Sequence, residues 1–188
     1  MKNAIILHGK PSKDHFYDVN FPSFSNYYWL PWLQKQLVVR EIPTQTPEVP
    51  NGWVADYTTW QKEFERYDIG PETILVGHSC GGGFLVRWLS EHKDISVGKV
   101  VLVAPWIDPA KEFDTGDFFD FTIDSDLAKR TAGITIFNSD DDGESVNKSV
   151  QILKEKIKGV KYKEFHDYGH FFDDRRMQFP ELLQEIIG

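Results

Sequence analysis

A serine flanked by glycines is the residue of this chain best suited to covalent chemistry. Ser79 lies in segment 77–81, whose sequence is Gly-His-Ser-Cys-Gly, between the apolar run 73–76 and a helical pattern of apolar residues. Gly-x-Ser-x-Gly between a strand and a helix is typical of the nucleophile elbow, a sharp turn that presents a serine hydroxyl above a sheet. The glycines leave room for its strained backbone. The Cys80 N–H, at the start of the helix, is a candidate donor to an oxyanion.

Ser79 needs a base within hydrogen-bond reach, and the base needs a carboxylate to orient it. His166 and His170 both lie beyond the last strand-like segment. His166 stands at the end of that segment, where it can simply cap the strand. His170 follows a glycine in a loop that can fold back over the sheet, so we predict that His170 is the base.

The candidate acids are three consecutive aspartates, Asp140, Asp141 and Asp142, directly after an expected strand over 133–138. An acidic triplet is usually a solvated turn, and at least two of these residues are expected to be that. The pattern of strands and loops does not choose between them. The order serine, acid, histidine along the chain, with each group at the carboxyl end of a strand, fits one known catalytic arrangement.

The remaining histidines and the single cysteine give weaker signals. His8 and His78 stand at strand ends and are expected to be structural. His166 and His170 are four residues apart, with Asp173 and Asp174 nearby, but this segment lacks a helical pattern that would place both rings on one face. One cysteine cannot form an intramolecular disulfide or a cysteine-based zinc site. We therefore expect no metal.

Strand-like and helix-like segments alternate along the chain. Short, mostly uninterrupted apolar runs predict strands over residues 4–7, 37–43, 73–78, 99–105, 133–138 and 160–165. Apolar residues at helical spacing predict helices over 26–37, 52–67, 80–93, 144–158 and 179–187. We predict one α/β domain over 1–188, a three-layer α/β/α sandwich with a mostly parallel sheet of about six strands. The irregular segment 106–126 is too short for a separate lid domain.

Loops at the carboxyl ends of the strands carry further candidates. The first strand is expected beside the strand before Ser79, so the backbone after Gly9 lies near the serine. The Lys10 N–H is therefore a second candidate oxyanion donor. The loop 12–26 and segment 106–126 supply aromatic residues that either line an apolar acyl pocket or pack as ordinary loops: Phe16, Phe21, Phe24, Trp106, Phe113, Phe118 and Phe119.

The charge of the chain excludes several classes of partner. Its 188 residues carry a formal net charge of −8, with no basic run longer than a pair. Nucleic acids and anionic membranes attract clustered Lys and Arg, so neither is an expected partner. The apolar run near the N-terminus covers only residues 4–7, which is too short for a signal peptide, and no run reaches the length of a membrane span. We expect a cytoplasmic protein, and the sequence does not indicate a protein partner.

Short motifs spread over nearly the whole chain share the pattern of one known family. They are the strand into His-Gly at 8–9, Trp-x-x-Trp-Leu at 29–33, a Pro-rich segment at 43–50, the elbow at 77–82, Val-Ala-Pro at 103–105, Ser-x-x-Asp at 139–142 and Gly-His-Phe at 169–171. In these motifs the chain resembles the small, lidless α/β-hydrolase family of serine hydrolases, which includes the vertebrate retinoblastoma-binding serine hydrolase and many bacterial proteins.

The resemblance implies the α/β-hydrolase fold without a large lid, and a triad of Ser79, His170 and Asp142. Members of the family have a small residue three positions before the catalytic Asp, and Ser139 takes that place here. Asp141 stays the alternative acid, because the residues that often follow the acid in the family are absent from this chain.

The resemblance also implies an activity. The triad would hydrolyse a small ester, thioester or amide through an acyl-enzyme, and the N–H groups of Cys80 and Lys10 would hold the oxyanion. The expected partner is a small-molecule acyl substrate, and no cofactor is implied. The alternative is a protein-interaction or ligand-binding module that keeps the hydrolase fold with little turnover.

Overall fold

The computed structural model describes residues 2–173 and 175–188. At its centre lies a six-stranded sheet in the order β2-β1-β3-β4-β5-β6, in which every neighbouring pair is parallel. The strands are β1 (Ala4–Leu7), β2 (Thr44–Gln45), β3 (Ile74–His78), β4 (Val100–Val103), β5 (Ile134–Ser139) and β6 (Lys161–Phe165). The strand before Ser79, β3, therefore lies inside the sheet with β1 as its neighbour, as predicted.

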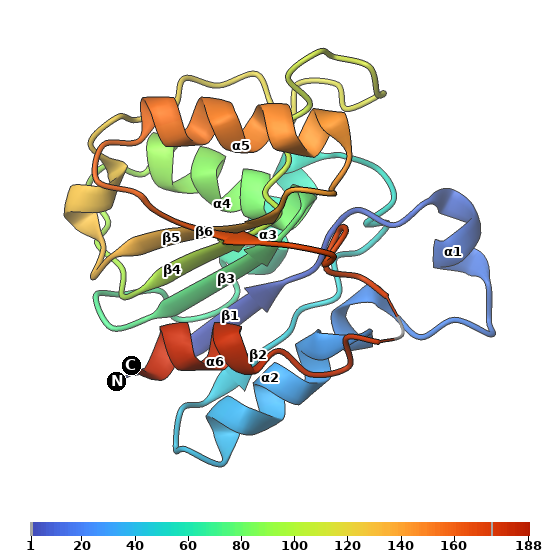
Figure 1. Ribbon diagram of the computed structural model, residues 1–188, viewed down its shortest axis with the longest axis horizontal. Coiled ribbons are helices and arrows are strands. Elements are labelled where there is room, and N and C mark those ends of the chain that lie inside the picture. The colour runs from blue at the N-terminus through green and yellow to red at the C-terminus, as the bar shows by residue number, and fades with distance from the viewer. Residues whose placement is uncertain (1, 174) are drawn as a thin grey trace.

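Helices cover both faces of the sheet, which confirms the predicted three-layer α/β/α architecture (Figure 1). The longer helices are α2 (Trp29–Val38), α3 (Tyr57–Phe64), α4 (Cys80–Glu91), α5 (Glu144–Lys156) and α6 (Pro180–Ile187). Helices α4 and α5 lie on one face, and α2 and α6 lie on the other. No helix in the described ranges is both long enough and apolar enough to cross a membrane.

The prediction of a strand over 37–43 was wrong. The apolar run at its start belongs to α2, which continues to Val38 because Leu33 and Leu37, four residues apart, are both fully buried. Val38 and Val39 are β-branched but 47% and 56% exposed. The backbone then reverses at Glu41, whose φ is 61°. Pairing with β1 begins only beyond this turn, so β2 is two residues long.

Burial differs sharply between the middle of the sheet and one edge. Every residue of β1, β3 and β4 is buried, as expected for strands covered on both faces. The edge strand β6 has no buried residue, and Lys161, Lys163 and Glu164 are exposed. The strand that leads into Ser79, β3, and the two strands beside it therefore lie in the core, whereas β6 pairs with a strand on one side only.

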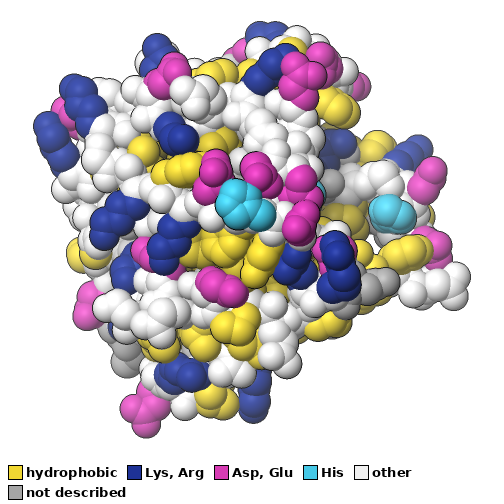
Figure 2. Space-filling model, in the orientation of Figure 1, with side chains coloured by type: hydrophobic (Ala, Val, Ile, Leu, Met, Phe, Trp, Pro, Cys, Tyr) yellow, Lys and Arg dark blue, Asp and Glu magenta, His cyan; other side chains and the backbone are white. Residues whose placement is uncertain are grey.

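The first long loop is more ordered than the sequence indicates. It contains a short helix, α1 (Lys13–Tyr17), and a 3₁₀ turn, η1 (Phe24–Asn26). The side chain of Ser12 caps α1 by accepting a hydrogen bond from the His15 N–H at 3.2 Å. Figure 1 shows that α1 projects from the rest of the molecule, and hydrophobic side chains are visible on this projection in Figure 2.

The segment 106–126 has neither strand nor helix, as predicted, and one arginine holds it against α4. The Arg87 Nη1 donates hydrogen bonds to the carbonyl oxygens of Asp117 and Phe118, at 2.6 and 3.0 Å. Its Nε donates to Glu91 at 2.9 Å, and its guanidinium lies 3.6 Å from the centre of the Tyr57 ring. This buried side chain therefore provides two backbone carbonyl groups of the segment with hydrogen-bond donors.

Replacing Arg87 with methionine is expected to lower the free energy of unfolding by about 2–3 kcal/mol, because the buried Phe118 carbonyl loses a charged donor. The shift is measured as the midpoint of urea unfolding. Arg40→Met is the matched control, since Arg40 is exposed and bonds only to Gln36 within its own helix region. Its effect should stay within about 0.5 kcal/mol. Equal shifts for the two variants would contradict the anchoring role.

Candidate active site

Ser79 forms the turn between β3 and α4 in a strained conformation, with φ 51° and ψ −120°. The surrounding backbone holds this conformation in place. The Ser79 N–H donates to the Val103 carbonyl at 2.9 Å, and the Ser79 carbonyl accepts from the N–H groups of Gly83 and Trp106 at 3.1 and 3.0 Å. A non-glycine residue at positive φ persists only where its surroundings enforce it. The turn therefore has the geometry of the nucleophile elbow that the sequence predicts.

The two glycines of the elbow are required by close backbone contacts. A Cβ on Gly77 would lie 2.7 Å from the Gly81 carbonyl oxygen. A Cβ on Gly81 would collide with the His8 carbonyl oxygen and lie 2.9 Å from that of Leu7. The start of α4 thus packs directly against β3 and the end of β1, and only glycine fits at both positions.

His170 lies in the loop after β6 and contacts Asp142, which follows β5. The Nδ1 of His170 lies 2.9 Å from Oδ2 and 3.1 Å from Oδ1 of Asp142. The Asp142 side chain is 3% exposed and that of His170 is 37% exposed. An ionised carboxylate only accepts hydrogen bonds, so Nδ1 donates and Nε2 is left free to accept a proton.

The three consecutive aspartates make three different contacts. Asp140 bonds to Nδ1 of the exposed His166 at 2.6 Å, at the molecular surface. Asp141 accepts hydrogen bonds from the Ser139 hydroxyl and from the Gly169 N–H, and these bonds hold its pKa below the usual range. Asp142 alone contacts His170. Asp141 therefore ties down the loop before His170 rather than the imidazole itself.

Ser79, His170 and Asp142 line one pocket of about 570 Å³. Among the described residues, the Ser79 hydroxyl and His170 are not hydrogen-bonded to each other here, and such bonds often form only when substrate binds. Other lining residues come from the first loop, from segment 106–126 and from the start of α5: Lys10, Pro11, Ser12, Trp106, Phe113, Gly143, Ser145 and Val146. The pocket therefore brings a serine hydroxyl, an imidazole and a carboxylate into one cavity.

Backbone N–H groups stand on two sides of Ser79. Cys80 begins α4, and a Cβ on Gly9 would lie 3.0 Å from the Cβ of Ser79, so the Gly9–Lys10 peptide is adjacent to the serine. In the described part of the chain, neither the Cys80 N–H nor the Lys10 N–H is bonded to an acceptor. Free amides at this position suit an oxyanion.

His8 orients the second of these amides, a role that the sequence did not reveal. Its Nε2 accepts from the Val49 N–H at 3.1 Å, so Nδ1 carries the proton and donates to the Gly9 carbonyl at 2.6 Å. That carbonyl belongs to the same peptide as the Lys10 N–H, and in a trans peptide the two groups point in opposite directions. Burial lowers the pKa of His8, which favours this neutral form.

His78 supports the loop of His170, again as a residue that the sequence marked only as structural. Its Nε2 donates to the His170 carbonyl at 2.8 Å, and its ring stacks on Phe172 with 4.1 Å between the ring centres. Burial lowers the pKa of His78 well below its usual value, so the ring is neutral. No sequence signal indicates this contact, because its hydrogen-bond partner is a backbone carbonyl 92 residues away.

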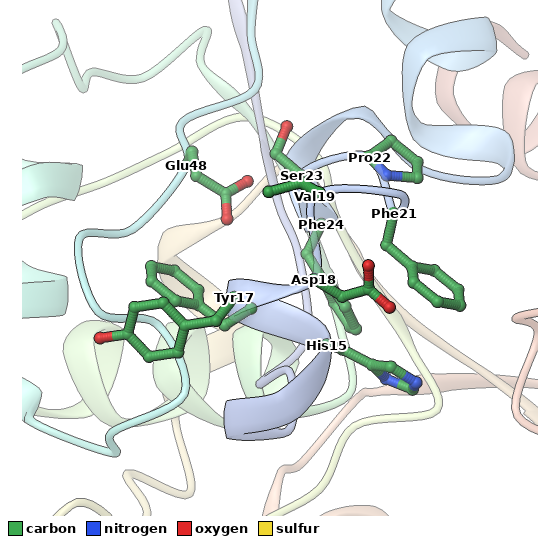
Figure 3. A pocket seen from close by; sticks show the side chains of 10 residues that line it. His15, Tyr17, Asp18, Val19, Phe21, Pro22, Ser23, Phe24 and Glu48 are labelled. Carbon is green, nitrogen blue, oxygen red and sulfur yellow. The ribbon is translucent and has the colours of Figure 1, made fainter.

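The structure places the other candidates away from Ser79 or in different roles. Phe16, Phe21 and Phe24 line a separate pocket of about 300 Å³ beside α1 (Figure 3). Of the predicted aromatic residues, Trp106 and Phe113 line the Ser79 pocket, and Phe118 is fully buried. The described residues contain no group of three or more metal ligands, and Asp174 lies outside them.

Comparisons with known proteins agree with this architecture. A family model for the alpha/beta hydrolase fold matches residues 44–133, which include Ser79. The ydeN gene product of B. subtilis superposes with a TM-score of 0.81 at 21% identity, covering 98% of this chain and 96% of that chain. Est1E from Butyrivibrio proteoclasticus with bound ferulic acid gives a TM-score of 0.64 at 14% identity, covering 99% and 86%.

A third solved structure points the same way. The alpha-beta serine hydrolase homologue from Coxiella burnetii gives a TM-score of 0.57 at 19% identity, covering 100% of this chain and 85% of that chain. No curated protein matches the chain by sequence. Similarity to the retinoblastoma-binding serine hydrolase in particular stays a prediction. By its sheet topology, its family match and its structural neighbours, the chain has the α/β-hydrolase fold without a large lid.

Proposed function

We propose that the chain is a serine hydrolase that cleaves a small ester, thioester or amide through an acyl-enzyme, most closely a carboxylesterase. The observation that carries the proposal is the contact between His170 Nδ1 and the buried side chain of Asp142, in the lining of the pocket that also contains the elbow serine. With Nδ1 donating to Asp142, the Nε2 of His170 is the ring nitrogen that can act as the base.

The proposed reaction has two steps. The Ser79 hydroxyl attacks the substrate carbonyl carbon while His170 Nε2 takes its proton, and the N–H groups of Cys80 and Lys10 bind the oxyanion. The protonated His170 then donates its proton to the leaving group as the carbon–leaving-group bond breaks. Water activated by His170 attacks the acyl-enzyme in the same way and releases the acid. Asp142 holds the ring orientation in both steps.

Labelling with a fluorophosphonate probe tests the proposal. The natural chain should be labelled covalently at one site, and Ser79→Ala should abolish labelling because it removes the nucleophile. His170→Ala should slow labelling by about 10⁴-fold or more, since the hydroxyl loses its base. His166→Ala is the matched control, because the exposed His166 contacts Asp140 at the surface.

The labelling experiment also separates the proposal from its alternative. Circular dichroism of each variant shows whether it is folded. If the folded natural chain is not labelled, Ser79 is not activated, and a binding module that keeps the fold without turnover becomes the better description. Labelling that survives in Ser79→Ala would place the reactive group elsewhere.

A further inference from the structure

The pocket around Ser79 contains one lysine, Lys10, whose charge has no ion-pair partner among the described residues. Lys10 is half-buried at the end of β1 and lines the pocket together with Ser79 and His170. The acidic side chain in the lining, Asp142, is bound to His170. Within the described residues Lys10 forms no ion pair. In a chain with a formal net charge of −8, a cation left without a carboxylate partner beside the nucleophile is available to a ligand.

The positive charge of Lys10 is close enough to influence Cys80, the residue next to Ser79. Burial raises the pKa of the Cys80 thiol, and the positive charge of Lys10 offsets part of that effect. Cys80 is the residue directly after Ser79, at the N-terminal end of α4. The ammonium charge and the positive end of the helix dipole therefore favour negative charge in the same part of the pocket.

Three other lining residues of the pocket, Trp106, Phe113 and Val146, are apolar. Trp106 donates a hydrogen bond from Nε1 to the Ser145 hydroxyl at 2.9 Å, and Phe113 packs edge-on against it with 5.1 Å between ring centres. Val146 is buried beside them. A ligand in this pocket meets apolar side chains and a single positive charge, which is the pattern of a site for an amphiphilic anion.

We propose that this site takes substrates that carry an anionic group near the reacting carbonyl, and that Lys10 binds that group. The inference rests on the proposed hydrolase function. The expected substrate is an ester or thioester that also carries a carboxylate. A short carbon chain links this carboxylate to the reacting carbonyl, on either the acyl part or the leaving group. The apolar side chains of the pocket contact the carbon atoms between the carboxylate and the reacting carbonyl.

Matched esters test the proposal. The natural chain is assayed with three esters. 4-Nitrophenyl butyrate carries no carboxylate, mono-4-nitrophenyl glutarate carries one on its acyl part, and 4-carboxyphenyl butyrate carries one on its leaving group. After correction for the intrinsic reactivity of each ester, we expect kcat/KM to be at least about tenfold higher for one of the anionic esters than for the neutral one. Higher ionic strength should reduce that ratio.

Substitutions at Lys10 separate charge recognition from the backbone role. Lys10→Met should abolish the preference for the anionic ester, chiefly through KM, and Lys10→Arg should restore it. Both substitutions keep the backbone N–H of residue 10. The readout is therefore the ratio of kcat/KM for the anionic ester to that for the neutral ester. Lys13→Met is the control, because Lys13 lies on α1 over the Trp53 ring and not in the pocket. An unchanged ratio in Lys10→Met, or no anionic preference in the natural chain, overturns the proposal.

A binding measurement keeps the two proposals distinguishable. Calorimetric titration of Ser79→Ala with monomethyl glutarate reports anion binding without turnover, so it applies even if the serine is never labelled. We expect Lys10→Met in that background to weaken binding at least about fivefold. Equal binding, or none at about 10 mM ligand, overturns the anion site and leaves the labelling result to decide the hydrolase proposal.

Discussion

Asp142→Asn is expected to lower kcat for ester hydrolysis by about 10⁴-fold while the protein stays folded. Asparagine has the shape of aspartate, but its amide can offer an N–H to His170 Nδ1. The imidazole would then carry its proton on Nε2, where it cannot accept the proton of Ser79. The positive charge that develops on His170 would also lose its counter-ion. The measurement is steady-state kinetics on a neutral aryl ester, with circular dichroism to confirm folding.

The neighbouring aspartates provide matched controls for this change. Asp140→Asn makes the same change two residues earlier, where the side chain bonds to the exposed His166, and should leave kcat within about twofold. Asp141→Asn retains an acceptor for the Gly169 N–H and should cost far less than Asp142→Asn. A larger loss in Asp141→Asn than in Asp142→Asn would assign the acid to Asp141 instead.

Gly81→Ala is expected to destabilise the fold by about 3 kcal/mol or more, because its Cβ would collide with backbone rather than with a flexible side chain. The carbonyl oxygens of Leu7 and His8, at the end of β1, cannot move without disturbing this buried strand. The measurement is the midpoint of chemical unfolding followed by fluorescence. Gly70→Ala is the control, since no atom lies within 4 Å of a Cβ there. Similar midpoints for both variants would contradict the steric argument.

The alternation of buried strands and helices was predictable because each element has a strong periodic signal. The elbow was predictable for the same reason, since a run of β-branched residues, a glycine-flanked serine and a helical pattern coincide at Ser79. The strand at 37–43 was not, because the Val38 and Val39 pair favours a strand locally. Tertiary burial of Leu33 and Leu37 on one helix face outweighs that local preference.

For the candidate site, the sequence predicts which loops come together but not which of the adjacent side chains contact each other. Order along the chain brings the acidic triplet and His170 to the same edge, but the choice among three adjacent carboxylates depends on where each side chain points. Asp141 turns toward the Gly169 N–H, and Asp142 turns toward the imidazole. The contacts of His8 and His78 are equally invisible in sequence, because their partners are backbone groups far away in the chain.

The exposed edge strand β6 is the part of the sheet expected to unfold locally before the rest. Proteins open in cooperative parts before they unfold as a whole, and a strand bonded on one side with exposed residues opens at a lower free energy than buried central strands. His170 follows β6, whereas Ser79 is anchored in the middle of the sheet. Partial opening at this edge would separate His170 from Ser79 while the rest of the sheet persists. Function and global stability are thus governed by different free energies in this chain.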